Sequence, residues 1–247
     1  MKLSRYKHDS ELSYAFGATL VYELAKTHPE LITRVFLRPD LSMQGKKIIE
    51  ILSMLRGLEI EIIENNKVFN VLGAKESCLL IAEFQKPNTT LTPIGTAHIV
   101  LVNPSDSGNL GAIMRSAVAF GYQDIAIITP AVDAYDPKTI RASMGAIFHL
   151  NIQQFSSFEN YSQLYGNFGT NPRKYYAFML NKNAQKLTEL SYIGNNYAII
   201  FGNEATGLPE SFANIAQPIF IPQSDNVDSL NLSVASSIAM YHFSQQK

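Results

Sequence analysis

The chain has little of what marks a secreted, membrane-bound or metal-dependent protein. Its 247 residues contain one cysteine, Cys78, which excludes a disulfide framework and a paired-cysteine metal site. No apolar run approaches the ~18 residues of a membrane span, and the first residues lack the apolar segment of a secretory signal. We therefore expect a cytoplasmic protein that acts without a membrane.

The chain also lacks the charge excess of a broadly basic nucleic-acid-binding protein. Its formal net charge is −1, so any contact with RNA would need a local patch. Lys2, Arg5 and Lys7 are one candidate patch, and an ordinary solvated segment is the alternative. The metalloprotease, serine-hydrolase and dinucleotide-binding signatures HExxH, GxSxG and GxGxxG are missing as well. The sequence thus gives no support to metal catalysis, a serine triad or an oxidoreductase.

What is present is the composition of a globular α/β protein, with 46% hydrophobic and 17% charged residues. In the first part of the chain, apolar spacing predicts helices over residues 11–26 and 46–57, the second closed by Gly57. Short apolar runs predict strands at 32–37, 58–63 and 77–84. This alternation predicts a small α/β domain over residues 1–86. The Pro- and Thr-bearing stretch that follows predicts a linker over residues 87–96.

The second part, residues 97–247, has the pattern of a mostly parallel sheet with helices between its strands. Its buried strands are predicted at 98–102, 124–129, 175–180, 197–202 and 218–222. Polar, mostly glycine-bearing loops follow three of them: NPSDSGNLG (103–111), GNEATGLPE (202–210) and IPQSDNVDSLN (221–231). Because ligands bind beyond the carboxyl ends of strands in such sheets, we expect these loops to form one pocket.

Arg115 is the most informative single residue in this part of the chain. Its helical neighbours three and four positions away are small and apolar, which suggests that another backbone packs closely against that face. An unpaired buried guanidinium costs several kcal/mol, so Arg115 needs a carboxylate, a phosphate or an opening to a pocket. Two interpretations stay open: a structural ion pair, with Glu204 as the obvious partner, or a contact with a ligand.

The last segment, SLNLSVASSIAMYHF (229–243), predicts a packed helix that Ser229 can cap. Its small residues suit close packing. Packing does not explain the polar side chains of Asn231 and Ser233 in the first turn, beside the loop 221–231.

Three segments of the chain, in this order, resemble the motifs of SpoU-type (TrmH-like) RNA ribose 2′-O-methyltransferases of the SPOUT superfamily. They are NPSDSGNLGAIMRSAVAFG (103–121), IIFGNEATGLP (199–209) and FIPQSDNVDSLNLSVASSIAMY (220–241). The segment RASMGAIFHL (141–150) is similar to the stretch between the family's first two motifs. In the first part, FGATLVYELAK (16–26) and RVFL (34–37) resemble the small L30e-like domain that precedes many of these enzymes.

This resemblance implies a SPOUT-type α/β domain with a trefoil knot and a mostly parallel sheet, preceded by an L30e-like RNA substrate-binding domain. It implies transfer of a methyl group from S-adenosylmethionine, without a metal, to a ribose 2′-hydroxyl of structured RNA, with ribosomal RNA favoured over transfer RNA. The donor would be held by backbone groups at the positions matching Gly202, Ile221 and Leu230. The enzyme would be a homodimer.

By the same correspondence, the family's polar site positions fall on Asn109, Arg115, Glu204, Asn231 and Ser233. Arg115 matches the arginine assigned to activating the 2′-hydroxyl. A guanidinium stays protonated up to a pKa above about 12. We therefore expect Arg115 to hold a phosphate or carboxylate and to stabilise the developing alkoxide, rather than to act as a base.

Two positions depart from the family's pattern. Ser107 stands where many relatives have proline, and Ala205 stands where many have glycine. A β-carbon at Ala205 would be strained if the loop needs a positive φ there. The alternative function is therefore a catalytically inactive RNA-binding protein of the same fold.

Overall fold

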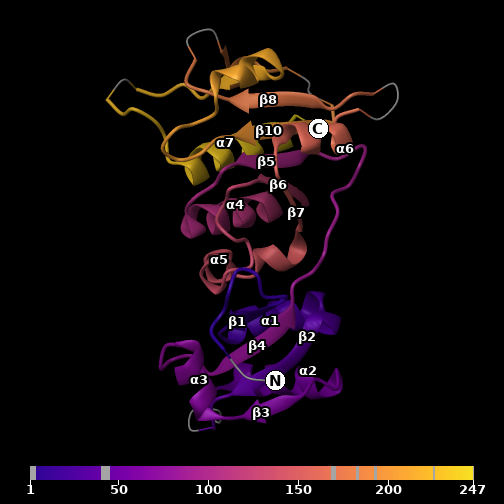
Figure 1. Cartoon of the computed structure of the whole chain (residues 1–247), viewed down its shortest axis with the longest axis vertical. Helices are drawn as coiled ribbons and strands as arrows, with labels where there is room; N and C mark the ends of the chain where they lie inside the picture. Colours follow the sequence, from indigo (N-terminus) through magenta and orange to yellow (C-terminus); the bar gives the residue numbers. More distant parts are fainter. Residues whose placement is uncertain are drawn as a thin grey trace. The chain divides into compact units, whose positions relative to one another are not determined.

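A computed structural model describes residues 4–39, 45–167, 171–181, 184–191, 194–224 and 226–246, so that Lys2 lies outside the described residues. The chain divides into two compact units (Figure 1). Unit 1 comprises residues 1–88 and 133–149, and unit 2 comprises residues 89–132 and 150–247. The sequence places 133–149 in the second domain, whereas its packing places it in unit 1.

Unit 1 is a four-stranded sheet with helices, in the strand order β1, β4, β2, β3. Its strands are β1 (Leu12–Phe16), β2 (Ile32–Leu37), β3 (Ile62–Glu64) and β4 (Leu80–Gln85). Strand β4 is antiparallel to β1 and β2, and β3 is parallel to β2. The helices are α1 (Ala18–Thr27), α2 (Lys46–Gly57), α3 (Asn66–Leu72) and α5 (Pro137–Ala142), with the short 3-10 turns η1 (Pro29–Leu31) and η3 (Ala146–His149).

The first part of the predicted helix 11–26 is wrong. Residues 12–16 form β1, whose backbone pairs with β4 in the register Tyr14↔Glu83. Gly17, at φ 104°, then turns the chain into α1. The predicted role of Gly57 is also wrong, because Gly57 is the last residue of α2 and the left-handed residue beyond it is Glu59, at φ 57°.

Unit 2 contains a seven-stranded sheet in the order β7, β6, β5, β10, β8, β11, β9. Every neighbouring pair of strands is parallel, which confirms the mostly parallel sheet. The strands are β5 (His98–Val102), β6 (Asp124–Ile128), β7 (Asn151–Phe155), β8 (Lys174–Phe178), β9 (Gln185–Lys186), β10 (Tyr197–Phe201) and β11 (Gln217–Phe220).

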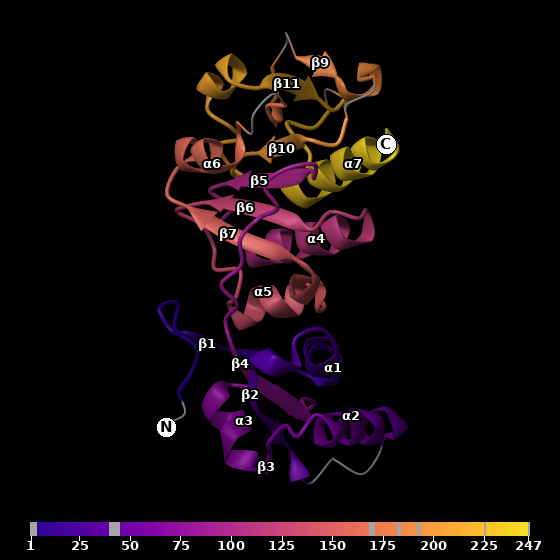
Figure 2. The same cartoon turned by 90° about the vertical axis from the view of Figure 1, so that its right-hand side faces the viewer.

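Helices cover both faces of this sheet (Figure 2). Helix α6 (Phe158–Tyr165) packs Phe158 and Tyr161 against Val100 and Ala126 of the sheet. Helices α4 (Ser107–Ala119) and α7 (Leu232–Ser244) pack against each other on the opposite face. The short turns η4 (Leu187–Glu189) and η5 (Glu210–Asn214) complete the unit. Because the strands are parallel, β5, β8, β10 and β11 all end at the same edge of the sheet.

Buried polar groups hold the stretch at the start of unit 2 against its sheet. The Leu91 side chain is buried, and its backbone N–H donates to Gln153 and Tyr165. The Arg173 guanidinium is buried and donates to four backbone carbonyls, those of Pro93, Thr96, Tyr165 and Tyr197. These bonds replace the water that the guanidinium loses.

Among the described residues, none of the helices has the length and apolar character needed to span a bilayer.

Candidate active site

A cavity of about 710 Å³ lies at the carboxyl ends of the strands of unit 2. Residues that follow β8, β10 and β11, together with the start of α7, form its walls. On one side Phe178 and Phe201 stack with ring centroids 4.7 Å apart. Phe201 is buried and Phe178 is partly exposed, so the cavity has an aromatic wall, mainly Phe178, beside loops rich in backbone polar groups.

The residues predicted to hold the methyl donor meet at this cavity. Gly202 follows β10, Ile221 follows β11 and Leu230 precedes α7, and all three line the cavity. The loops 202–210 and 221–231 thus converge as expected. The expectation for loop 103–111 is wrong, because its residues are not among those that line the cavity; this loop contacts the cavity wall through hydrogen bonds to Glu204. The loop after β8, which includes Met179 and Leu180, lines it too and was not anticipated, because the sequence there predicts a continuing strand.

The loop after β10 folds back tightly on itself. Asn203 forms an isolated bridge with Gly207, which has a φ of 66°. A β-carbon at Gly202 would overlap the backbone of Gly207 and Leu208. Glycine at position 202 is therefore needed for the loop to keep this shape at the cavity wall.

Glu204 connects this loop to the loop after β5. One carboxylate oxygen, Oε2, accepts from the backbone N–H of Ser105 at 3.1 Å and from its hydroxyl at 2.8 Å. The other, Oε1, accepts from the N–H of Asp106 and the amide of Asn109, both at 3.2 Å. Partial burial alone would raise the pKa of Glu204, but these hydrogen bonds lower it below its ordinary value. Glu204 is therefore an ionised acceptor at neutral pH.

The hydrogen bonds continue from Glu204 to the start of α7. The Asn231 amide donates to Oδ1 of Asn109 at 3.0 Å. The Oδ1 atom of Asn231 accepts from the N–H and hydroxyl of Ser233 at 2.8 and 2.7 Å. Asn231 is thus the N-cap of α7, and the predicted cap at Ser229 is wrong.

The charge on Glu204 sets the direction of this whole series. A carboxylate only accepts hydrogen bonds, so Asn109 must present its NH₂ group to Glu204 and its oxygen to Asn231. Asn231 must then present its NH₂ group to Asn109, which leaves its oxygen free to cap α7. Four of the predicted polar site residues therefore form one series: Glu204, Asn109, Asn231 and Ser233.

Arg115 lies outside this series. Its side chain is exposed and does not line the cavity, and within the described residues it makes no hydrogen bond or ion pair. The expectation of a buried guanidinium and the interpretation of an ion pair with Glu204 are both wrong. Arg115 lies about 9 Å beyond Asn109 along α4, at 1.5 Å per residue. The close packing between α4 and α7 falls on the next residue, where the hydroxyls of Ser116 and Ser237 are 2.7 Å apart.

Sequence reasoning missed two residues that support Glu204. Ser105 supplies two of its donors. Asn203 donates to the carbonyl of Asn103 at 2.8 Å and accepts from the N–H of Ala205 at 2.9 Å. Ala205 is not among the residues with positive φ, so the expected strain at that position is absent. Both missed residues lie inside loops that the sequence predicts to be near the pocket. Their polar character in those loops is the signal by which they could have been found.

Within the described part of the chain, no group of three or more His, Cys, Asp or Glu side chains is placed to hold a metal ion.

The family model and the relatives that match this chain are all described as RNA methyltransferases. The family model described as the SpoU rRNA Methylase family matches residues 96–241. An uncharacterized tRNA/rRNA methyltransferase of Synechocystis is 31% identical over 63% of this chain, but the match spans 55% of that relative's length. The 23S rRNA (guanosine-2′-O-)-methyltransferase RlmB of Acinetobacter baylyi is 24% identical over 95% of this chain and 97% of its own.

Solved structures agree on the fold. The SpoU methyltransferase AviRb from Streptomyces viridochromogenes, in complex with the cofactor AdoMet, superposes with a TM-score of 0.80 at 20% identity, over 96% of this chain and 90% of its own. The family match covers more than half of the chain and includes the loops that bound the cavity and the Glu204 series. The chain belongs to the SpoU rRNA Methylase family.

Proposed function

We propose that the protein transfers a methyl group from S-adenosylmethionine to a ribose 2′-hydroxyl of RNA. The observation that carries this proposal is the cavity at the carboxyl edge of the sheet, where Gly202, Ile221 and Leu230 line the walls and Glu204 begins the hydrogen-bond series. The names of family relatives, among them 23S rRNA 2′-O-methyltransferases, support the same reaction.

The residues present fit S-adenosylmethionine. The partly exposed ring of Phe178, which stacks on the buried Phe201, offers an apolar surface to the adenine, and the tight loop at Gly202 places backbone groups beside it. The carboxylates of Glu204 and Glu210 at the cavity favour a cationic ligand. When bound, the donor supplies a methyl group that is already activated on a positively charged sulfur.

The chain's own residues would act mainly by positioning. The series from Glu204 through Asn109 to Asn231 joins two loops and the first turn of α7, and so fixes the walls of the cavity. Positioning of reactants supplies up to ~7–11 kcal/mol in favourable cases. Arg115 does not line the cavity of its own chain. Its exposed guanidinium would bind a substrate phosphate with two parallel hydrogen bonds and would stabilise charge developing on the 2′-oxygen where the bound RNA meets it.

Ribosomal RNA is the favoured substrate. The relatives RlmP of Bacillus subtilis and RlmB of Acinetobacter baylyi are named for 23S rRNA, and each is matched over most of its length. A smaller solved relative, 28% identical with a TM-score of 0.55, is named for methylation of C/U34 on tRNA, so transfer RNA is the second substrate to test. We further propose the family's trefoil knot for unit 2 and an L30e-like, RNA-binding role for unit 1.

We propose a homodimer on the basis of α7. Val234, Ile238 and Tyr241 form a stripe along this helix and are 46%, 40% and 55% exposed. These positions lie on one face of the helix. A second copy of the chain would bury this face.

A single, free cysteine suits a reducing compartment such as the cytoplasm.

The test is methyl transfer in vitro. Wild-type protein and Arg115→Ala are incubated with tritiated S-adenosylmethionine and ribosomal RNA from a strain in which the gene is deleted. We expect the wild type to place the label on a ribose 2′-oxygen, and the variant to bind the donor without transferring it. Equal transfer by the variant would reject the role of Arg115, and no transfer by either protein would favour the inactive RNA-binding alternative.

A further inference from the structure

Unit 1 has a cavity of its own, of about 460 Å³. Its walls come from the N-terminal segment, β1, the end of α3 and the residues after it, and α5. Helix α5 belongs to the stretch 133–149, which lies within the part of the chain that matches the family. The cavity is therefore built jointly by the first 88 residues and by a segment of the methylase sequence.

The rim of this cavity is positively charged. Four cations line it, against one carboxylate: Arg5, Lys75, Lys138 and Arg141, with Asp136. Asp136 is engaged locally, because it caps α5 by accepting from the N–H of Lys138 at 2.7 Å. Across the described residues, none of the four cations forms an ion pair with a carboxylate. Unpaired cations around a cavity attract an anion, in a chain whose net charge is −1.

The floor of the cavity is aromatic. Tyr14 and Phe16 lie two residues apart on β1, so their side chains share one face of the sheet. Their rings meet edge to face, with centroids 6.3 Å apart. The Tyr14 hydroxyl lies 3.2 Å from both the Glu83 carboxylate and the Ser4 carbonyl, which share its one hydrogen. Tyr6 is a third aromatic lining residue and packs against the same apolar cluster. Tyr14 is buried, so the partly exposed rings of Phe16 and Tyr6 are the ones that a flat ring can contact.

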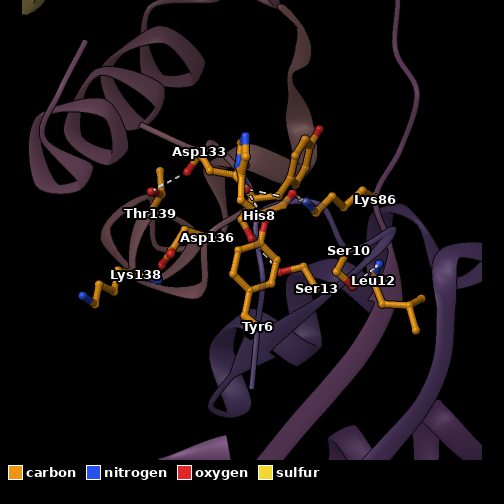
Figure 3. A network of polar contacts seen from close by, with 11 residues as sticks. Tyr6, His8, Ser10, Leu12, Ser13, Lys86, Asp133, Asp136, Lys138 and Thr139 are labelled. Atoms are coloured by element: carbon orange, nitrogen blue, oxygen red, sulfur yellow. Dashed lines mark hydrogen bonds and ion pairs between the residues drawn. The ribbon is translucent and has the colours of Figure 1, made fainter. Parts of the chain in front are cut away.

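A network centred on Asp133 fixes these walls to one another (Figure 3). The Tyr6 hydroxyl donates to Asp133, His8 lies 2.8 Å from the same oxygen, and the Lys86 ammonium lies at 3.6 Å. The Ser13 hydroxyl donates to the carbonyl of Tyr135 at 2.6 Å. Burial alone would raise the pKa of Asp133, but these partners lower it, so the carboxylate stays ionised at neutral pH. The cavity is thus preformed by the fold of unit 1.

We propose that this cavity binds an unpaired nucleotide of the RNA substrate, with the base on the aromatic floor and the phosphates on the cationic rim. The proposal rests on the proposed function and adds residues, other than those of the methyl-transfer site, that hold the RNA. Proteins recognise unpaired nucleotides by this combination of aromatic stacking and cationic contacts to the backbone. The cationic rim is a local basic patch, which is what RNA binding needs in a chain whose net charge is −1.

Cys78 provides a single-site readout of occupancy. It lines the cavity and is the one cysteine of the chain. Burial raises its pKa, so alkylation by N-ethylmaleimide is followed by mass spectrometry at mildly alkaline pH. The probe is an unstructured oligouridylate of about 12 nucleotides, within the site sizes of single-strand binders. We expect the oligonucleotide to slow alkylation at least about fivefold, without S-adenosylmethionine.

Charge reversal tests the rim. The double variant Lys138→Glu/Arg141→Glu should weaken oligonucleotide binding about tenfold or more, because it replaces phosphate contacts by repulsion. Lys75→Glu, on a different segment, should act in the same direction. The control is Lys47→Glu/Arg56→Glu, which makes the same charge change on exposed positions of α2 that do not line the cavity. Urea unfolding of each variant verifies the fold.

Three results would overturn the proposal: alkylation of Cys78 that the oligonucleotide does not slow, equal weakening by the rim and control variants, or protection by free uridine monophosphate but not by the oligonucleotide. The last result would assign the cavity to a free nucleotide. Failure here with methyl transfer intact leaves the proposed function standing. Oligonucleotide binding at this cavity without donor binding or transfer would instead reject the proposed function alone.

Discussion

Replacing Glu204 by glutamine should disturb the candidate site more than the loss of one charge suggests. Glutamine has the same shape but carries one oxygen and one NH₂ group. Glu204 uses one oxygen for Ser105 and the other for Asp106 and Asn109. If the glutamine oxygen stays with Ser105, the glutamine NH₂ group faces the N–H of Asp106 and the NH₂ group of Asn109, which are both donors. If Asn109 turns its amide to compensate, it presents NH₂ to the NH₂ of Asn231, and the conflict moves to the N-cap of α7.

The magnitude follows from the bonds lost. Hydrogen bonds to a charged group contribute about 1.5–3 kcal/mol each, and the substitution removes two of them at either orientation. Glu204 is only partly buried, so water replaces part of the loss. We therefore expect the free energy of unfolding to fall by about 2 kcal/mol, equivalent to roughly a 30-fold change in an equilibrium constant.

The assay is urea unfolding of the wild type and Glu204→Gln at pH 7. The matched control is Glu210→Gln, which makes the same change at an exposed carboxylate on the same cavity. The control should change stability by less than about 0.5 kcal/mol. A similarly small change for Glu204→Gln would show that the carboxylate does not orient the amides of Asn109 and Asn231.

Three further predictions follow from the structure of unit 2. Gly202→Ala should lower the affinity for S-adenosylmethionine at least about tenfold, because its β-carbon overlaps the loop backbone; unchanged affinity in equilibrium dialysis would contradict this. Burial, with a smaller contribution from Arg173, lowers the pKa of His98 from 6.5 to about 4. Between these pH values His98 binds a proton in the unfolded chain but not in the folded chain, so the free energy of unfolding should fall as pH drops from 6.5 towards about 4. In urea unfolding, His98→Gln should reduce this dependence of the free energy of unfolding on pH. An unchanged dependence would contradict the prediction. Ile238→Asp should convert the proposed dimer to a monomer in sedimentation experiments, and a wild-type monomer or a dimeric variant would contradict the proposed interface.

Local signals in the sequence were sufficient for elements whose apolar pattern matches their burial. The run at 98–102 and the helix at 46–57 have their predicted bounds. The strand β1 was missed because its helical apolar spacing continues into α1, and only pairing with β4, some 70 residues later, decides the backbone conformation. The place of 133–149 in unit 1 likewise depends on contacts such as that of Ser13 with Tyr135.

In the candidate site, too, local sequence predicted some features, whereas others depend on contacts between distant segments. The polar loops and their common edge could be predicted, because parallel strands end together. The partners of Glu204 could not, since Ser105 and Asn109 lie about a hundred residues away and the pairing depends on how two loops meet. The exposure of Arg115 was missed for a related reason: small neighbours on a helix do not say which side of it faces the partner helix. The Ser116–Ser237 contact decides that orientation.

The proposed reaction requires the cavity of unit 2 to bind a methyl donor, and calorimetric titration of the purified wild-type protein with S-adenosylmethionine tests this binding most directly. We expect saturable heat that corresponds to one donor per chain. The absence of heat at millimolar concentrations of the donor would contradict the assignment of this cavity to S-adenosylmethionine.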